Sequence, residues 1–398
     1  MRVAFVACAK TKADSAMPAG ALYASPLYRK SLLAALDSSD RIYIVSAKHG
    51  ILDPQTLIEP YDVTLKAMPR EQRREWGRAT GATLGAFLKR RDTAILFCGE
   101  EYIESLRPDL ERIGSTLEEP LATLSLGQRL QRLAILNGED GLRQQAAAFS
   151  RMLHRLWISQ SGGRRITNTH GKQGWPTKGL YFILEPTHGV TGGRMPRIVR
   201  VGTHAVSAGS KTSLWDRLST HRGTSTGGGS HRSSIFRLHV GRATVNQNPS
   251  LHWPKTWAQG QSAPATIRAE EDALERKVSE IIGDLSVLWL DIDDEAGPTS
   301  ERAYLERNAI ALLSRVNLLA ATRYPTWLGR LSPDWRIAAS GLWNLNHVFA
   351  KPDEKFLSRL EVAIDRTIGR KGGDSFATTR KKLPTKKQLS LFQGKREA

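Results

Sequence analysis

A single glutamate occupies the apolar face of a predicted helix in the last third of the chain. In the segment TSERAYLERNAIALLSRVN, Glu306 shares that face with Ile310 and Leu313 at i, i+4 and i+7 spacing. A carboxylate on a core-facing stripe is costly unless a cation lies beside it. An arginine such as Arg302 could be that cation, in a purely structural pair.

Two strands and a short helix earlier in the chain must position the partners of this helix. Gly179-Leu180-Tyr181 opens one predicted strand, and Arg200-Val201-Gly202 closes the next. The segment SLWDRLSTHRG then predicts a helix with Ser213 as its N-cap. Arg217 lies on this helix, beside its apolar face.

In this order the four segments resemble the motifs of the GIY-YIG nuclease superfamily, over residues 175–350. The matching stretches are G-L-Y, R-V-G, L-W-D-R-L-S-T-H and L-E-R-N-A-I-A-L-L-S. The resemblance implies an α+β nuclease domain in which Glu306 holds one divalent metal ion, Mg²⁺ or Mn²⁺. It also implies that Arg217 binds the scissile phosphate and that Tyr181 orients or deprotonates the attacking water. Phosphodiester hydrolysis needs such a cation and such a positioned nucleophile.

The match departs from the family pattern at the second motif, where Arg200 replaces the tyrosine, and in a longer loop between the two strands. His204, two residues past Gly202, titrates near neutrality and could act as the proton acceptor instead. Structural alternatives remain for the other residues, since Tyr181 could be an ordinary strand aromatic and Arg217 a solvated helix charge.

A glycine-rich loop, RGTSTGGGSHRSS, follows the arginine helix and matches no nucleotide-binding fingerprint. Its backbone N–H groups, Arg222 and Arg232 predict contacts with DNA phosphates. We expect His221, at the end of the helix, to support the site or to contact phosphate. Arg200 joins these three as a predicted DNA-binding residue.

Residues 1–136 predict an α/β domain with a mainly parallel sheet, because short β-branched runs alternate with helical stretches. Cys8, Ser46 and Cys98 then fall at the carboxyl ends of three strands, the edge where open parallel sheets bind ligands. Other polar residues lie next to these strand ends, although any one of them could be an ordinary loop residue. They are Lys10, Lys12, Lys48, His49, Glu59, Tyr61 and Asp62.

The segments VACAKTK, LYASPLYRK, SAKHGILDP and IEPYDVTL resemble a prokaryotic domain of unknown function, over residues 1–135. That domain is in turn distantly similar to the uracil-DNA-glycosylase-like fold. The resemblance implies a domain that handles nucleobases, and an enzyme acting on a base must draw it into a pocket. Residues 137–174 predict a helix and then a Gly/Ser/Thr-rich linker.

The charge of the chain favours a polyanionic partner. Lys and Arg number 58 against 39 Asp and Glu, for a net charge of +19, and such a balance drives binding to phosphate backbones. Two cysteines are too few for a disulfide framework, which fits a reducing cytoplasm near the nucleoid. No run is long and apolar enough to span a membrane.

Residues 351–398 predict a helix followed by a disordered basic tail that contains one apolar pentapeptide, QLSLF. It resembles the peptide by which many bacterial DNA-processing proteins bind the replicative sliding clamp. The resemblance implies that Leu391 and Phe392 enter an apolar groove and that Gln388 makes a polar contact, with Leu389 between them. Packing against the protein's own surface is the alternative.

Together these patterns predict a cytoplasmic, metal-dependent DNA endonuclease joined to a nucleobase-sensing or base-excising domain. Restriction of modified or foreign DNA is the expected setting, with DNA repair second. Two alternatives remain open. The first is a non-catalytic DNA-binding protein with a degraded nuclease fold. The second is a glycosylase or tRNA-base enzyme with an accessory nuclease-like half.

Overall fold

A five-stranded sheet organises the N-terminal domain, in a computed structural model that describes residues 1–186, 194–205, 207–250, 252–320 and 326–369. The strand order is β4-β3-β1-β6-β7. All neighbours pair in parallel except β3 and β4. The strands are β1 (Arg2–Ala7), β3 (Arg41–Ser46), β4 (Gly50–Leu52), β6 (Thr93–Phe97) and β7 (Thr116–Glu118). The predicted α/β domain with a mainly parallel sheet is therefore confirmed.

Helices cover both faces of this sheet, because successive side chains of β1 pack alternately into two different hydrophobic clusters. Ala4 and Val6 pack into one hydrophobic cluster with α2 (Pro26–Ser38), whereas Val3 and Phe5 pack into another with α4 (Glu100–Ile113). Such burial on both faces is typical of parallel sheets. The remaining elements of this domain are β2 (Met17–Pro18), α1 (Ala19–Leu22), β5 (Leu57–Ile58), η1 (Leu65–Ala67), α3 (Arg70–Thr83) and η2 (Leu84–Ala86).

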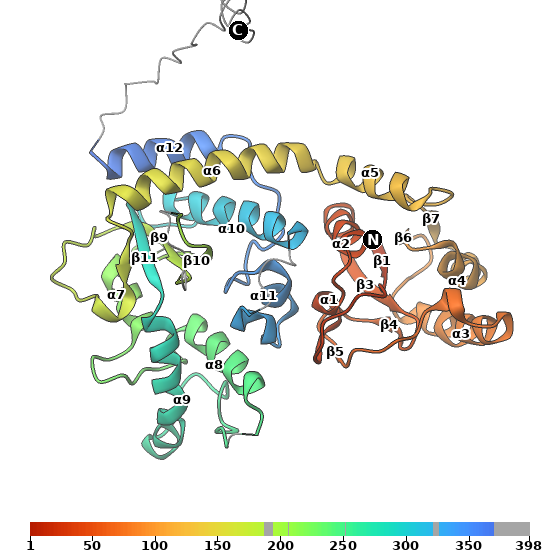
Figure 1. Cartoon of the computed structure of the whole chain (residues 1–398), viewed down its shortest axis with the longest axis horizontal. Helices are drawn as coiled ribbons and strands as arrows, with labels where there is room; N and C mark the ends of the chain where they lie inside the picture. Colours follow the sequence, from red (N-terminus) through yellow and green to blue (C-terminus); the bar gives the residue numbers. More distant parts are fainter. Residues whose placement is uncertain (187–193, 206, 251, 321–325, 370–398) are drawn as a thin grey trace, which may run out of the picture.

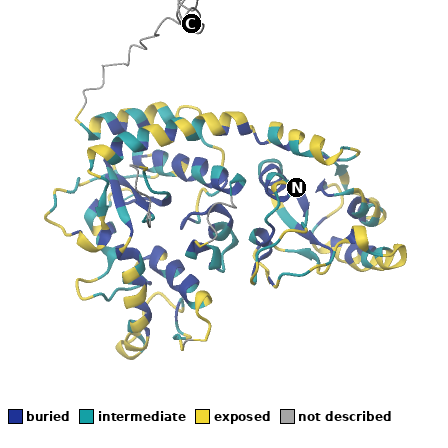
Figure 2. Ribbon diagram, in the orientation of Figure 1, coloured by how far each residue is buried: buried dark blue, intermediate teal, exposed yellow. Residues whose placement is uncertain are grey.

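Two helices, α5 (Leu126–Leu136) and α6 (Glu139–Ser159), lead from the N-terminal domain to the C-terminal one. Figure 1 shows them end to end along one side of the molecule, with α12 (Phe356–Thr367) beside α6. Exposed residues recur along α5, α6 and α12 in Figure 2.

A four-stranded antiparallel sheet, in the order β10-β9-β11-β8, forms the centre of the C-terminal domain. Its strands are β8 (Arg164–Arg165), β9 (Gly179–Leu184), β10 (Ile198–Thr203) and β11 (Ser286–Asp291). The segment predicted as a linker contributes β8 and the short helix η3 (Ile166–Asn168), whose Ile166 is buried. That part of the linker prediction was wrong, because two residues can pair with β11 inside a polar sequence.

Both faces of this sheet are also covered by helices. Phe182 lies in a cluster with α6, α12 and α10 (Glu301–Leu319), whereas Tyr181 lies in a cluster with the helices of the opposite face. Those helices are α7 (Leu214–Arg222), α8 (Ile235–Gln247) and α9 (Ala265–Gly283). The chain then passes through η5 (Leu328–Leu331) and α11 (Trp335–Ser340).

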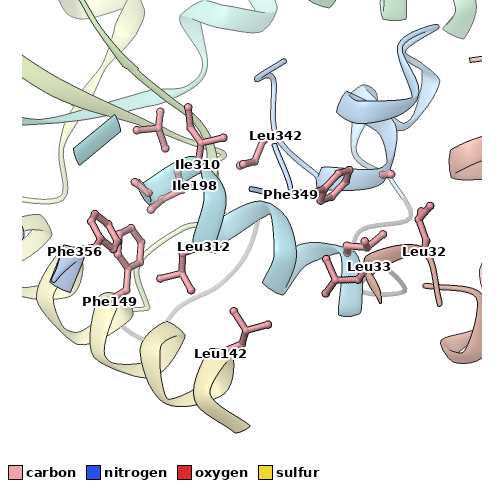
Figure 3. Close-up of a cluster of buried hydrophobic side chains, with 14 of the residues drawn as sticks. Leu32, Leu33, Leu142, Phe149, Ile198, Ile310, Leu312, Leu342, Phe349 and Phe356 are labelled. Carbon is pink, nitrogen blue, oxygen red and sulfur yellow. The ribbon is translucent and has the colours of Figure 1, made fainter. Parts of the chain in front are cut away.

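The two domains share one hydrophobic cluster. Figure 3 shows Leu32 and Leu33 of α2 in the same cluster as Leu312 of α10 and Phe149 of α6. A buried ion pair crosses the same boundary, where both terminal nitrogens of Arg315 lie 2.7 Å from the carboxylate oxygens of Asp37. Within the described ranges, no helix has the length and apolarity that a membrane crossing requires.

Candidate nuclease active site

A hydrogen-bonded chain of three side chains runs through the centre of the C-terminal domain. The hydroxyl of Tyr181 lies 2.8 Å from Nε2 of His221, and Nδ1 of His221 lies 2.7 Å from Oγ of Ser234. Tyr181, His221 and Ser234 are 0%, 1% and 0% exposed. The chain joins β9 to α7 and to the start of α8, so it fixes how α7 lies on the sheet.

Gly202 provides the space that the Tyr181 hydroxyl occupies. The two residues are direct partners in the pairing of β10 with β9. A Cβ atom on Gly202 would lie only 2.2 Å from the Tyr181 hydroxyl oxygen, which is far inside contact distance. A glycine at this position is therefore a packing requirement of the tyrosine opposite it.

Arg217 projects from α7, which begins with a capping box. Oγ of Ser213 accepts from the N–H of Asp216 at 3.2 Å, and the Asp216 carboxylate accepts from the N–H of Ser213 at 2.8 Å. This reciprocal cap sets the first turn of the helix. Arg217 is half-buried one turn before His221, so the Tyr181–His221–Ser234 chain holds the helix that presents it.

Glu306 lies in the same neighbourhood, half-buried on α10. Withdrawal from water raises the pKa of the Glu306 carboxyl, and the positive charges of Arg200 and Arg217 oppose that rise. A backbone hydrogen bond from Thr203 at the end of β10 opposes it as well. Arg200 and Arg217 are thus the cations expected beside a carboxylate on the apolar face of a helix.

Arg302 pairs with a different carboxylate. Its side chain is 0% exposed, and its Nε lies 2.6 Å from the carboxylate of Asp294. The structural alternative, an Arg302–Glu306 pair, is therefore not the arrangement found.

The same two arginines act on His221. Burial lowers the pKa of His221 well below its usual value, and the charges of Arg200, Arg217 and Arg237 lower it further. His221 is therefore neutral near pH 7, with one ring nitrogen as donor and the other as acceptor. The charges of Arg200 and Arg217 act on both His221 and Glu306, and Tyr181 is hydrogen-bonded to His221. These side chains therefore belong to one site.

Arg200, which stands where the family pattern has a tyrosine, is 7% exposed. Its guanidinium carbon lies 5.0 Å from the centre of the Phe236 ring, and a terminal nitrogen donates to the carbonyl of Trp343. Its Nε has no hydrogen-bond partner in the part of the chain that the structure describes. The residue thus adds a permanent positive charge to the interior side of the site, where the sequence predicted a DNA contact.

His204 has both ring nitrogens engaged. Nδ1 lies 2.7 Å from the carbonyl oxygen of Thr212, so it donates there, and Nε2 accepts from the N–H of Gly179 at 3.2 Å. Burial lowers the pKa of His204, and the nearby Arg302 adds to that effect. A base needs a free lone pair within reach of water, so this geometry favours a positioning role that ties β9 to the chain after β10.

The two predicted loop arginines differ in their surroundings. Arg232 makes a two-pronged ion pair with Glu271 of α9, with its side chain only 8% exposed. Arg222 is half-buried at the end of α7, beside a surface hollow that it shares with the loop residues Thr224–Gly227. Of the two, Arg222 is the one placed to meet a phosphate.

A divalent metal ion at Glu306 would have few protein ligands. Across the described residues, no group of three or more His, Cys, Asp and Glu side chains could hold a metal ion. Mg²⁺ commonly binds through one or two carboxylates and fills its other positions with water and substrate phosphate. The half-buried Glu306 fits that mode better than an all-protein metal cage.

In the N-terminal domain, predicted residues gather at the carboxyl ends of β1 and β3. The Tyr61 hydroxyl lies 2.7 Å from Oγ of Ser46 and 2.8 Å from the hydroxyl of Tyr23. Nζ of Lys12 lies 4.3 Å from the centre of the Tyr61 ring, and the His49 ring meets that ring edge-on at 5.3 Å. We call these residues the strand-end cluster.

The remaining N-terminal candidates lie around the strand-end cluster. Sγ of Cys8 lies 3.1 Å from the hydroxyl of Tyr102, and Nζ of Lys48 lies 5.8 Å from the centre of the Tyr61 ring. Lys10, Glu59 and Asp62 are exposed. Cys98 is buried, and burial raises the pKa of its thiol, so it belongs to the core.

Three side chains of these sites were not predicted. Tyr23, Tyr102 and Ser234 each meet their partner across 13 to 94 residues of sequence, which no local pattern reveals. Ser234 had one signal, since it stands before an apolar run as an N-cap does, and it caps α8 by accepting from the N–H of Arg237. The clamp-like residues Gln388, Leu389, Leu391 and Phe392 lie outside the described residues.

Comparison with known proteins finds a family match in each half of the chain. Residues 3–135 match a family of unknown function, DUF6884, and residues 141–370 match the GIY-YIG domain. No curated protein and no solved structure matches the chain. GIY-YIG domains are nucleases, which hydrolyse phosphodiester bonds, and the match spans more than half of the 398 residues, including all of the site around Glu306. The chain belongs to the GIY-YIG domain family.

Proposed function

We propose that the protein is a metal-dependent DNA endonuclease that uses the site around Glu306. The observation that carries this proposal is the convergence of Arg217, Arg200, Glu306 and the buried Tyr181–His221 pair, from four different elements of the fold. A half-buried glutamate beside two arginines and a neutral histidine is a cluster of perturbed groups, and such clusters are common at functional sites.

Each side chain has a role that its surroundings allow. Arg217 binds the scissile phosphate, because it is half-buried and its guanidinium is a two-pronged donor for phosphate oxygens. Glu306 would hold Mg²⁺ or Mn²⁺, which supplies positive charge against the phosphate and activates water. Arg200 adds a fixed charge from within the domain.

Tyr181 acts as a positioning residue in this proposal. It has no exposed surface, so its hydroxyl reaches His221 rather than solvent water. Through His221 it sets the angle of α7, and with it the position of Arg217. Small misplacements of a phosphate-binding group are costly to the rate, because reacting atoms must be held close to their final geometry.

The N-terminal domain, in our proposal, senses or excises a nucleobase, and the whole protein acts in restriction of modified or foreign DNA, or else in repair. Support comes from the strand-end cluster, where aromatic, hydroxyl and amine groups meet at the edge of a parallel sheet that commonly binds ligands. The two halves would then act on the same DNA in the cytoplasm.

Residues 388–392 would add the sliding clamp of DNA replication as a partner. This rests on the sequence QLSLF within a basic tail. A peptide spanning residues 384–398 should bind purified bacterial clamp at about micromolar affinity. The same peptide with Leu391→Ala and Phe392→Ala should not bind, and absence of wild-type binding at hundreds of micromolar clamp removes this partner.

A supercoiled-plasmid assay with Mg²⁺, on unmodified and modified DNA, tests the nuclease. Glu306→Ala should abolish cutting while DNA binding in a gel-shift assay stays nearly intact. Arg217→Ala should slow cutting by about 10²-fold or more, the scale of one lost transition-state contact. Glu354→Ala, an exposed glutamate before α12, is the matched control and should cut normally.

Full activity of Glu306→Ala would refute the assignment of the site. Binding without any cutting by the wild type would instead favour a DNA-binding protein with an inactive nuclease fold. Release of free base from modified DNA, without strand cleavage, would favour the glycosylase alternative.

A further inference from the structure

A cavity of about 250 Å³ lies between the two domains. On the N-terminal side its wall includes Lys12, Tyr23 and Arg29, around α1 and the start of α2, with the exposed carboxylate of Asp14 beside them. On the C-terminal side it includes Asn317 of α10, Trp327 before η5 and Gly341 after α11. Figure 1 shows α11 facing α1 across this boundary, and neither domain forms the cavity alone.

Arg29 is a buried cation in this wall with no acidic partner. Its residue is 5% exposed, and its side chain donates to the carbonyl of Ala24. It makes no ion pair with any residue that the structure describes. Burial lowers the pKa of Arg29, the direction expected when a charge leaves water without compensation. A buried, unpaired charge is costly, and an anion that enters the cavity offsets that cost.

Lys12 adds a second positive charge at the same wall. It is half-buried, and no carboxylate of the described residues forms an ion pair with it. Its Nζ instead lies over the rings of Tyr61 and Tyr23, 4.3 and 5.8 Å from their centres. Lys12 and Tyr23 also belong to the strand-end cluster, so the cavity and that cluster share two residues.

The other walls suit a flat ring. Trp327, Tyr23 and Tyr28 supply aromatic surface, and Met17 and Leu318 supply aliphatic surface. The Trp327 ring is held from behind by Arg197, whose guanidinium carbon lies 4.8 Å from its centre, and by Trp343 at 5.3 Å. Aromatic walls with a few placed polar groups are the usual composition of a small-molecule site, and domain boundaries are a usual place for one.

We propose that this interdomain cavity binds one nucleotide unit, with its phosphate near Arg29 and Lys12 and its base against Trp327. The volume of about 250 Å³ lies just below the ~300–1,000 Å³ of typical ligand sites, so we expect one nucleotide rather than a longer stretch. The nucleotide is either a free mononucleotide or one nucleotide drawn out of a DNA strand. The proposal does not depend on the nuclease assignment, because no residue of the cleavage site takes part.

Calorimetric titration of the full chain tests this in EDTA, which removes the divalent metal ions that DNA cleavage would need. The ligands are the deoxynucleoside monophosphates, the matching nucleosides, inorganic phosphate and a single-stranded 12-mer. A monophosphate should bind with a micromolar Kd, and the nucleoside and phosphate alone should each bind at least tenfold more weakly. Binding of the monophosphate alone identifies a free nucleotide as the ligand, and competition by the 12-mer identifies DNA.

Two variants and a control locate the binding. Arg29→Gln should weaken monophosphate binding about tenfold or more, because a charged hydrogen bond is lost. Ala338→Phe fills the cavity without removing a charge, and it should abolish binding. It keeps the proposal testable if Arg29→Gln proves unstable. Arg41→Gln, at an exposed arginine of β3, should bind as the wild type does. The proposal is overturned if no monophosphate binds at 1 mM, or if Ala338→Phe binds as tightly as the control.

Discussion

His239 lies on α8 with 3% of its surface exposed, and its Nδ1 has no hydrogen-bond partner among the described residues. Burial lowers its pKa to about 4 from the usual 6.5, and the charge of Arg242 adds to that shift. Asp334 opposes the shift, whereas Arg200 and Arg336 reinforce it more weakly. In the unfolded chain the same imidazole binds a proton at about pH 6.5.

The unfolded state therefore binds more protons than the folded state between about pH 6.5 and pH 4. Stability rises with pH wherever that is so, which means that it is lost as the pH falls through this window. A difference of about 2.5 pKa units between the folded and unfolded values corresponds to about 3 kcal/mol at 1.36 kcal/mol per unit. We expect His239 to contribute a loss of that order to acid unfolding.

Urea unfolding at pH 7.0 and pH 4.5 measures the effect. The difference in unfolding free energy between the two pH values should be smaller by about 2–3 kcal/mol in His239→Gln than in the wild type, because the amide does not titrate. His252→Gln, at an exposed histidine, is the control and should keep the wild-type difference. An unchanged difference in His239→Gln would show that burial does not shift this histidine.

Asp37→Asn should lower the unfolding free energy by about 3–5 kcal/mol, because it leaves the guanidinium of Arg315, 3% exposed, without its charge partner; a loss below 1 kcal/mol in urea would contradict this. Tyr181→Phe should cost about 1–3 kcal/mol, since His221 loses a buried hydrogen bond, and equal midpoints for the two proteins would refute it. His204→Ala should leave the acid limb of the cleavage rate where it is in the wild type, because both ring nitrogens are already engaged. A flattened limb in a pH–rate series would return the base to His204.

Much of the fold follows from local sequence patterns. The strands β1, β3 and β6 and the helices α2, α3 and α6 were predicted because each has a short-range signal, an apolar run or a helical period. The strand β11 was missed, although SVLWLD is an apolar run, because it stands between helices and pairs with β9 more than 100 residues earlier. Pairing over such a distance leaves no mark on either segment.

The candidate site likewise contains some residues that the sequence reveals and others that it does not. Tyr181, Arg217 and Glu306 could be proposed from the sequence because each lies on an element of the expected kind, in the expected order. The surroundings of Arg200 could not be found, because its contacts with Phe236 and Trp343 are made by the packing of α8 and the chain after α11. Arg237, fully buried between Glu275 and the end of α7, was likewise invisible among 58 basic residues.

The hydrophobic cluster that Leu32 and Leu33 share with α10 has a consequence for work on the separate halves. One family match ends at residue 135 and the other begins at residue 141, so the gene could be divided between them to express the two halves separately. Such a cut exposes buried leucines on both fragments, and exposed apolar patches of that kind lead to aggregation. The halves should melt together in a single calorimetric transition, and each should be poorly soluble when expressed alone. We therefore expect the two halves to fold as one unit, although they match two different families.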